Sequence, residues 1–435
     1  MKKAALHNLG CKVNAYETEA MQKMLEDAGY EIVPFSDVAD VYVINTCSVT
    51  NMADRKSRQM LHKAKHKNEN AIVVATGCYV QTKEEEALKD LAIDIVIGNN
   101  KKHELIDRIN AFEKNGENAD VIDINDNKQE FEELFIEETA EHTRAFIKVQ
   151  DGCNQFCSYC IIPYARGRVR SRKISNVIEE VKRLAANGFK EVVLTGIHLS
   201  SYGIDCEDSL LNLIKEVHKI DGISRIRLGS LEPKIITEEF VKELSKLPKI
   251  CPHFHLSLQS GCDETLKRMN RKYTTSEYEN GCNILRKYFD HPAITTDVIV
   301  GFPGETEEEF NNTKEFLERI HFYEMHIFKY SKRQGTRAAT MENQVPEEIK
   351  TKRSAQLISL GNEMSKEFRD YYLGQEQEVL FEEKTIINSK EMYVGYTKEY
   401  VKVAVESEKM IENQLVKGKI TGFADDNVYI MESIH

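Results

Sequence analysis

Short apolar runs alternate with segments of helical spacing along most of the chain, and this alternation limits the fold more than any other feature. Between residues 1 and 113 the runs VYVINT and AIVVAT are rich in β-branched residues and are separated by helical stretches. A second series begins at Arg144. Such alternation predicts parallel sheets covered by helices. The strand candidates of the second series are 145–150, 191–196, 225–230, 254–259, 295–301 and 325–331.

Six strand–helix units predict a TIM-like (β/α)6 barrel that is incomplete, because a full barrel uses about eight strands. Residues 114–143 lose the alternation and become acidic, which predicts a linker. Residues 373–435 show short alternating strands separated by turns, which predict a small all-β barrel. The predicted fold is α/β. It has a parallel-sheet domain at 1–113, the partial barrel at 144–372 and the all-β module at 373–435.

The composition describes a globular chain with a hydrophobic content of 41% and a net charge of −12. No apolar run reaches the length of about 20 residues that a membrane helix needs, and the N-terminus lacks the apolar core of a signal peptide. We therefore expect a cytoplasmic protein without membrane contact. In a reducing compartment the ten cysteines favour metal binding or catalysis over disulfides.

Three cysteines, Cys153, Cys157 and Cys160, form the pattern C-x3-C-x2-C directly after the first strand of the predicted barrel. Barrel enzymes place their chemistry at this end of the strands. Three thiolates can hold three irons of a 4Fe–4S cube, which leaves the fourth iron open to a small molecule. The alternatives are a zinc site completed by a histidine, or plain structural thiols.

Three further cysteines, Cys11, Cys47 and Cys78, each follow a strand candidate of the N-terminal domain. The C-terminal ends of parallel strands lie along one edge of a sheet, so the fold can bring these thiols together. We predict a second cluster there, with buried structural cysteines as the alternative. The other four match no ligand pattern and are predicted to be structural: Cys206, Cys251, Cys262 and Cys282.

A basic run follows directly after Cys153, Cys157 and Cys160, which we call the second triplet because it comes second along the chain. A second basic run occupies residues 55–67. Charge runs usually form solvated faces, but beside an active site they can clamp the phosphates of a nucleic acid. We predict RNA contacts for the first run and a solvated face for the second. The residues of the first run are Arg166, Arg168, Arg170, Arg172 and Lys173.

The C-x3-C-x2-C pattern, with Tyr159 before its last cysteine, resembles the radical S-adenosylmethionine superfamily. The stretches SLEP, LSLQSGCDETLKRMNR and DVIVGFPGET resemble its methylthiotransferase branch. The resemblance implies two 4Fe–4S clusters, one on each cysteine triplet. It also implies S-adenosylmethionine on the open iron, cleaved by one electron to methionine and a 5′-deoxyadenosyl radical. Contacts to this cofactor are expected at Tyr159, Gly196, Glu232, Gln259 and Gly301, where turn glycines and surface caps are the alternative.

Residues 373–435 resemble the TRAM domain, an RNA-binding barrel of tRNA-modifying enzymes, although a purely structural role stays open. The whole chain thus resembles methylthiotransferases that act on N6-threonylcarbamoyladenosine at tRNA position 37, in the anticodon stem-loop. The branch acting on isopentenyladenosine usually has Gln-Met-Asn after the first cysteine, where this chain has Lys12, Val13 and Asn14. Another branch modifies an aspartate of a ribosomal protein. The resemblance further implies an electron donor such as flavodoxin or ferredoxin. A non-catalytic RNA-binding zinc protein is the rival class.

Overall fold

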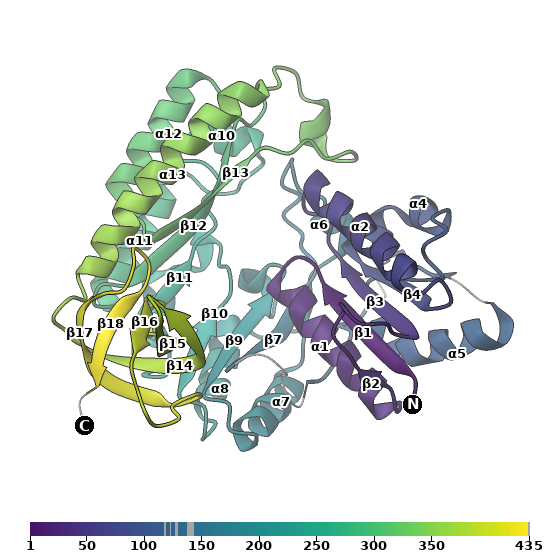
Figure 1. Ribbon diagram of the computed structural model, residues 1–435. Coiled ribbons are helices and arrows are strands. Elements are labelled where there is room, and N and C mark those ends of the chain that lie inside the picture. The colour runs from purple at the N-terminus through teal and green to yellow at the C-terminus, as the bar shows by residue number, and fades with distance from the viewer. Residues whose placement is uncertain (117–118, 122, 127–128, 137–142, 434–435) are drawn as a thin grey trace.

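The computed structural model of the protein describes residues 1–116, 119–121, 123–126, 129–136 and 143–433. Figure 1 shows an N-terminal sheet with its helices, a central body of strands and outer helices, and a C-terminal barrel that packs beside the central strands. Within the predicted linker at 114–143, residues 117–118, 122, 127–128 and 137–142 lie outside the described residues.

The N-terminal sheet has six parallel strands in the order β2-β1-β3-β4-β5-β6. Helices α1 and α5 pack their apolar side chains on one face of the sheet, and α2 and α3 pack on the other. The strands are β1 (Lys3–Asn8), β2 (Glu31–Ile32), β3 (Val41–Thr46), β4 (Ile72–Gly77), β5 (Ile95–Ile97) and β6 (Ala119–Asp120). The helices are α1 (Lys12–Asp27), α2 (Asn51–Lys67), α3 (Cys78–Thr82), α4 (Glu84–Leu88) and α5 (Leu105–Asn115). The predicted parallel α/β domain is therefore confirmed.

The central body contains six parallel strands that follow one another in chain order, as the sequence predicts for a partial barrel. One sheet has the order β10-β9-β7-β8 and the other β11-β12-β13. Two isolated bridges, Ile226 to Ile250 and Leu231 to Leu256, connect the two sheets. Strand β8 (Arg170–Ser171) pairs antiparallel with β7 and was not predicted. The parallel strands are β7 (Arg144–Asp151), β9 (Glu191–Gly196), β10 (Arg225–Leu228), β11 (His253–His255), β12 (Ala293–Val300) and β13 (Glu324–Lys329).

Helices cover the outside of these strands, and their ends carry the expected capping residues. At the starts of α11 and α12, Thr274 pairs with Glu277 and Thr306 with Glu309 in capping boxes, which satisfy backbone N–H groups that the helix leaves free. The helices are α6 (Ile162–Ala165), α7 (Ile174–Ala186), α8 (Leu210–His218), α9 (Glu238–Leu244), α10 (Asp263–Arg268), α11 (Thr275–Tyr288), α12 (Glu307–Ile320) and α13 (Glu347–Asp370).

The C-terminal strands close into a barrel in the order β14-β15-β16-β18-β17, which confirms the small all-β module. Phe381 and Tyr393 fill its core, whereas Phe423 is 61% exposed. Arg225 donates to the carbonyl oxygens of Tyr396 and Glu378 and thereby ties this barrel to β10. Its strands are β14 (Glu376–Ile387), β15 (Lys390–Tyr396), β16 (Lys402–Val405), β17 (Leu415–Phe423) and β18 (Tyr429–Ser433). In the described chain, we find no helix with the length and hydropathy to cross a membrane.

Candidate active site

The N-terminal cysteines lie at the ends of three neighbouring strands of one sheet. In the register of these strands Asn8 of β1 faces Asn45 of β3, and Thr46 of β3 faces Gly77 of β4. Cys11, Cys47 and Cys78 lie just beyond these strand ends. A Cβ on Gly10 would lie 3.0 Å from the sulfur of Cys47, so the loop that carries Cys11 runs directly against Cys47.

Two polar side chains link the three cysteines of this edge. Asn14 accepts from the Cys11 thiol at 3.7 Å and from Arg166 Nη2 at 2.5 Å. Arg166 Nε donates to Cys78 Sγ at 3.3 Å. Asn14 Nδ2 also donates to the carbonyl oxygen of Thr46, the residue before Cys47, at 3.1 Å. A guanidinium from the central body thus lies against the N-terminal triplet, where it stabilises negative charge on sulfur.

The second triplet lies in the loop that leaves the C-terminal end of β7. Gly152 opens this loop with a φ of +72°, and a Cβ at this position would lie 1.8 Å from the Arg168 carbonyl oxygen, so only glycine fits. The Cys160 N–H donates to the Cys157 carbonyl at 3.0 Å, which folds the loop back on itself. Arg271 Nη1 donates to Cys157 Sγ at 3.1 Å. The loop therefore holds its three sulfurs at the end of the barrel.

The chemistry of the donors favours iron–sulfur cubes at both triplets. Each triplet supplies three thiols, and cysteine thiolates are the ligands of such cubes. A structural zinc site uses four ligands, often with histidine among them. The all-thiol donor sets therefore fit iron–sulfur cubes.

Burial raises the thiol pKa of four cysteines in the two triplets: Cys11, Cys47, Cys153 and Cys160. It raises the pKa of Cys47 and Cys153 to about 11 and that of Cys160 to about 12. The Cys11 pKa is also raised by burial, which outweighs the opposing effect of Arg166. Iron binds thiolates, so assembly of a cluster here must release protons from these thiols.

The predicted RNA contact of the basic run is wrong for three of its five residues. Arg166 and Arg172 are fully buried and Arg170 is 3% exposed. The run enters the interface between the N-terminal domain and the barrel. There Arg172 pairs with Glu180, and Arg166 pairs with Glu17. These side chains hold the protein together and face no solvent.

Two residues of the run are exposed, as an RNA contact requires: Arg168 and Lys173. The guanidinium of Arg168 lies 4.6 Å from the centre of the Phe156 ring, within the loop of the second triplet. The contact of these two residues with RNA stays a prediction.

Glu232 connects the second triplet to neighbouring strand ends. It accepts from Gln155 Nε2 of the cysteine loop at 3.0 Å, and its second oxygen lies 3.3 Å from Arg271 Nη2. His198 Nε2 lies 3.3 Å from the same carboxylate. Burial opposes ionisation of Glu232, but His198 and Arg271 lower its pKa below the ordinary value. Arg271 thus bridges Glu232 and Cys157. It was not singled out from the sequence, although it ends the stretch LSLQSGCDETLKRMNR.

Of the other four predicted cofactor contacts, three have packing reasons for their residue types, and Gln259 adopts a backbone conformation that is uncommon for a non-glycine residue. A Cβ at Gly301 would lie 2.3 Å from Cγ of Lys350 in α13, so the glycine allows this helix to approach. A Cβ at Gly196 would lie 2.8 Å from a side-chain oxygen of β7. Tyr159 packs in an apolar cluster, and Gln259 adopts a φ of +72°. Contact of these residues with S-adenosylmethionine stays a prediction.

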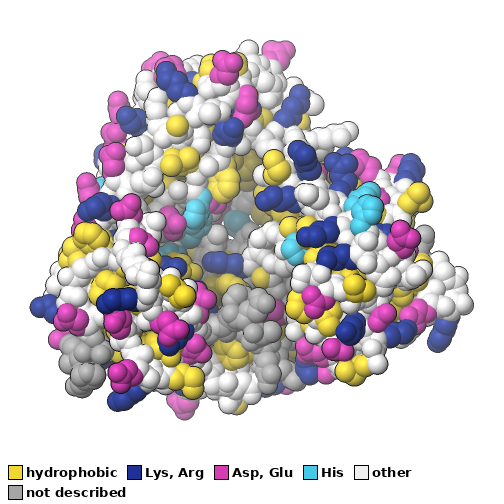
Figure 2. Space-filling view, viewed as in Figure 1, with side chains coloured by type: hydrophobic (Ala, Val, Ile, Leu, Met, Phe, Trp, Pro, Cys, Tyr) yellow, Lys and Arg dark blue, Asp and Glu magenta, His cyan; other side chains and the backbone are white. Residues whose placement is uncertain are grey.

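A cavity of about 670 Å³ lies between the three parts of the protein, a size typical of sites for small ligands. Residues from all six parallel strands of the central body line it. Cys11 and Lys12 of the N-terminal domain and Tyr400 of the C-terminal barrel also line it. Figure 2 shows this hollow at the centre of the molecule, with histidine and Lys or Arg side chains on its walls. The cavity therefore opens onto the N-terminal triplet from inside the partial barrel.

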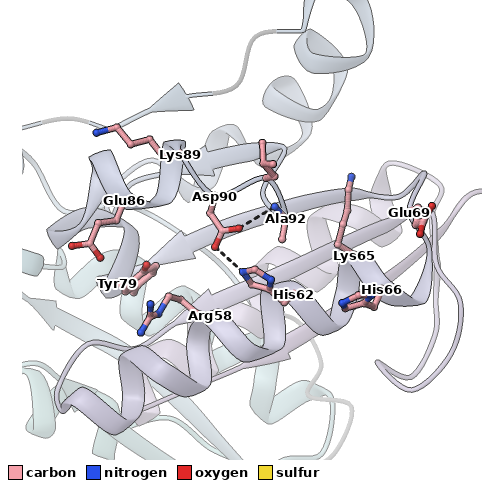
Figure 3. Close-up of a pocket in the computed structure, with 11 residues that line it drawn as sticks. Arg58, His62, Lys65, His66, Glu69, Tyr79, Glu86, Lys89, Asp90 and Ala92 are labelled. Carbon is pink, nitrogen blue, oxygen red and sulfur yellow. Dashed lines mark hydrogen bonds and ion pairs between the residues drawn. The ribbon is translucent and has the colours of Figure 1, made fainter.

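A second pocket, of about 710 Å³, lies on the outer face of α2 (Figure 3). Arg58, His62 and Lys65 contribute to its lining, all from the second basic run. His62 lies 2.9 Å from Asp90, and Lys65 lies 2.8 Å from Asp94, a carboxylate near this pocket. The pocket is open to solvent and is lined by none of the six clustered cysteines, so we place the chemistry in the central cavity.

Comparison with known proteins covers both halves of this site. Residues 147–317 match the Radical SAM superfamily, and residues 3–98 match the Uncharacterized protein family UPF0004. The chain is 42% identical to threonylcarbamoyladenosine tRNA methylthiotransferase MtaB of Bacillus subtilis, covering 97% of this chain and 94% of the relative. It is 44% identical to the MtaB of Aquifex aeolicus over 91% of this chain and 97% of the relative.

Another relative carries a different name. The chain is 36% identical to tRNA-2-methylthio-N(6)-dimethylallyladenosine synthase of Acetivibrio thermocellus, covering 95% of this chain and 88% of the relative. Among solved structures, the radical S-adenosylmethionine methyltransferase TsrM of Kitasatospora setae superposes with a TM-score of 0.58 at 16% identity, covering 78% of this chain and 77% of that one. This last likeness concerns the fold alone. The similarity along nearly the full length shows that the chain belongs to the methylthiotransferase family of radical S-adenosylmethionine enzymes.

Proposed function

We propose that the protein adds a methylthio group to carbon 2 of N6-threonylcarbamoyladenosine at position 37 of tRNA. The observation that carries the proposal is the central cavity, which has Cys11 of the N-terminal triplet on its wall, within a barrel whose first strand leads into the second triplet. The full-length similarity to two MtaB proteins supports the choice of base. The alternatives are dimethylallyladenosine in tRNA, which the name of a 36% identical relative supports, and an aspartate of a ribosomal protein.

We assign one 4Fe–4S cluster and S-adenosylmethionine to Cys153, Cys157 and Cys160, and an auxiliary 4Fe–4S cluster to Cys11, Cys47 and Cys78. When bound, a cluster with an open iron would supply the one-electron chemistry on S-adenosylmethionine that an inert C–H bond requires. Tyr159, Gly196, Glu232, Gln259 and Gly301 remain our candidates for holding the cofactor.

The protein side chains contribute positioning and charge. Arg271 places a cation against Cys157 and fixes Glu232 beside the cysteine loop, so the second triplet and its surroundings are held as one unit. Arg166 places a second cation against Cys78. The adenine must leave its stack to enter the cavity, as bases do in other enzymes that act on them.

The protein has to bind tRNA and a small electron donor. The exposed Arg168 and Lys173 contact the phosphates of the anticodon stem-loop, and the C-terminal barrel at 373–435 adds a TRAM-like RNA surface. The domain at 1–113 carries the auxiliary cluster and that at 144–372 the radical chemistry. Reduction requires a small electron donor such as flavodoxin or ferredoxin, and a tRNA substrate places the reaction in the cytoplasm.

Nucleoside analysis tests the proposal directly. Anaerobically reconstituted protein is incubated with S-adenosylmethionine, a reductant and tRNA carrying either threonylcarbamoyladenosine or dimethylallyladenosine, and the digested nucleosides are identified by mass spectrometry. We expect methylthiolation of the first nucleoside by the wild type and by Cys206→Ala, an exposed cysteine outside both triplets. Cys157→Ala should form neither deoxyadenosine nor product.

Other outcomes select other functions. Methylthiolation of dimethylallyladenosine or of a ribosomal-protein aspartate in place of the expected base would overturn the substrate. Deoxyadenosine formation by Cys157→Ala at the wild-type rate would remove the role of the second triplet. Zinc in place of iron in anaerobically prepared protein would favour the rival RNA-binding zinc protein.

A further inference from the structure

Lys12 is the first residue of α1, follows Cys11 and lines the central cavity. Its ammonium group lies 6.0 Å from the centre of the Phe146 ring on β7. Within the described residues, no carboxylate lies at ion-pair distance from its Nζ. The cavity wall next to Cys11 therefore presents a lysine without an acidic partner.

The two neighbouring cations of this wall are already compensated. Arg144 Nε lies 2.9 Å from Glu382 Oε1, and Arg227 Nε lies 2.8 Å from Glu191 Oε1. The guanidinium groups of both arginines also lie over the ring of Tyr400, at 4.8 and 4.7 Å from its centre. These contacts fix the side chains of Arg144 and Arg227. The ammonium group of Lys12 stays available to pair with an anionic ligand.

Lys12 is exposed to the cavity that it lines, so its ammonium group is accessible to a ligand. A carboxylate ligand would form a charge-assisted hydrogen bond with this ammonium group. The geometry and the charge balance point to the same kind of ligand.

The part of the lining that comes from the second sheet differs in chemistry. It is formed by β11, β12 and β13, and presents His253, His255, Asp297, Glu324 and His326. Asp297 lies 3.4 Å from Nε2 of His255, so its charge is directed to the histidines of that sheet. A ligand in the cavity thus meets histidine and acidic groups from this sheet and the cation of Lys12 from the N-terminal domain.

We propose that Lys12 binds the carboxylate of the threonyl group on the substrate adenine and thereby selects a base with an acidic N6 substituent. This inference rests on the proposed function. The threonyl carboxylate is the one anionic group of this base, and N6 is separated from carbon 2 by only two ring atoms. A lysine next to Cys11 can therefore hold the substituent while carbon 2 faces the N-terminal triplet.

The same contact rejects the alternative base. A dimethylallyl substituent has no charge and no hydrogen-bonding group, so it would leave the ammonium of Lys12 without an anionic partner. Discrimination of this kind depends on the charged group that the wrong ligand leaves unsatisfied. A charge-assisted hydrogen bond of this type corresponds to a preference of about 10-fold to about 100-fold.

The test compares binding of three labelled anticodon stem-loops to the reconstituted protein by fluorescence anisotropy. One RNA carries threonylcarbamoyladenosine, the second its threonyl methyl ester, and the third dimethylallyladenosine. We expect the wild type to bind the acid about 10-fold or more tightly than the ester. Lys12→Gln should bind acid and ester equally, and Lys12→Arg should keep the preference. Lys219→Gln removes an exposed charge outside the cavity and should behave as the wild type.

Two results would overturn the inference: equal binding of acid and ester by the wild type, or an undiminished preference in Lys12→Gln. Because Lys12 adjoins Cys11, iron per chain is measured for each variant. If Lys12→Gln loses iron, the comparison of acid and ester in the wild type still tests whether the carboxylate is recognised. Methylthiolation of threonylcarbamoyladenosine by the wild type without a role for Lys12 would refute this inference alone. Absence of that product would refute the proposed function itself.

Discussion

Replacement of Glu17 by glutamine should loosen the N-terminal domain from the barrel. Glu17 lies on α1, is fully buried and pairs with Arg166, with Lys148 at 2.7 Å and with Lys102 at 3.3 Å. Lys148 and Arg166 come from the barrel side of the interface, whereas Lys102 belongs to the N-terminal domain. Asp151 is the second carboxylate of this group and contacts the same lysine and arginine.

The expected magnitude follows from the charges that remain. Glu17→Gln leaves three buried cations, of which only Lys148 and Arg166 still contact Asp151, and removal of one member of a buried ionic group typically costs about 3 to 5 kcal/mol. Glutamine keeps a hydrogen-bond acceptor for one cation, so we expect a loss near the lower limit, about 3 kcal/mol. For domains of this size, that corresponds to a decrease of roughly 6 to 12 °C in Tm.

Differential scanning calorimetry measures this loss, with Glu26→Gln as the matched control. Glu26 lies on the same helix but is exposed, and its replacement should change stability by less than about 0.5 kcal/mol. Equal Tm values for wild type and Glu17→Gln at pH 7 would refute the claim that this ionic group holds the two domains together.

The pH dependence gives a second check. Burial opposes ionisation of Glu17, but Arg166, Lys102 and Lys148 hold its pKa well below the ordinary 4.5. A carboxylate with a depressed pKa stabilises the folded state above its unfolded pKa and loses that contribution as the pH falls. The difference in Tm between wild type and Glu17→Gln in cluster-free protein should therefore be full at pH 7 and shrink below about pH 4.5. A difference that stays constant across this range would contradict the assignment.

Three further substitutions test the second triplet and the basic run. Gly152→Ala places a Cβ 1.8 Å from the Arg168 carbonyl, so iron analysis should show the loss of about four irons per chain. Arg271→Gln removes the cation beside Cys157 and should make the reduction potential of the cluster more negative in an EPR-monitored titration; an unchanged potential would contradict this role. Arg168→Ala should weaken stem-loop binding and reduce its salt dependence by about one phosphate contact, whereas Arg172→Ala should lower Tm instead.

The placement of the cysteines was predictable because it depends on local pattern and topology. Cys11, Cys47 and Cys78 each follow a β-branched run, and the ends of parallel strands share one edge whatever the distance along the chain. The six parallel strands of the barrel were found for the same reason. Strand β6 was missed, since it is two residues long and lies in an acidic segment without a strand pattern.

The roles of the arginines were not predictable from the local sequence. A basic run after an active-site loop has the same appearance whether it faces RNA or an acidic partner within the fold. The partner of Arg166 is Glu17, 149 residues away, and that of Arg172 is Glu180 in the following helix. Only the docking of α1 against the barrel decides between these outcomes. The cavity around Lys12 depends on the same docking, because three separate parts of the chain line it.

The central claim is that two cysteine triplets, one at the edge of the N-terminal sheet and one in the loop after β7, hold two iron–sulfur cubes. The most direct measurement is iron and acid-labile sulfide per chain after anaerobic reconstitution, in the wild type and in a variant with alanine at Cys11, Cys47 and Cys78. The account predicts about eight irons in the wild type and about four in the variant. About four irons in both proteins would show that the N-terminal triplet holds no cluster and would contradict the account.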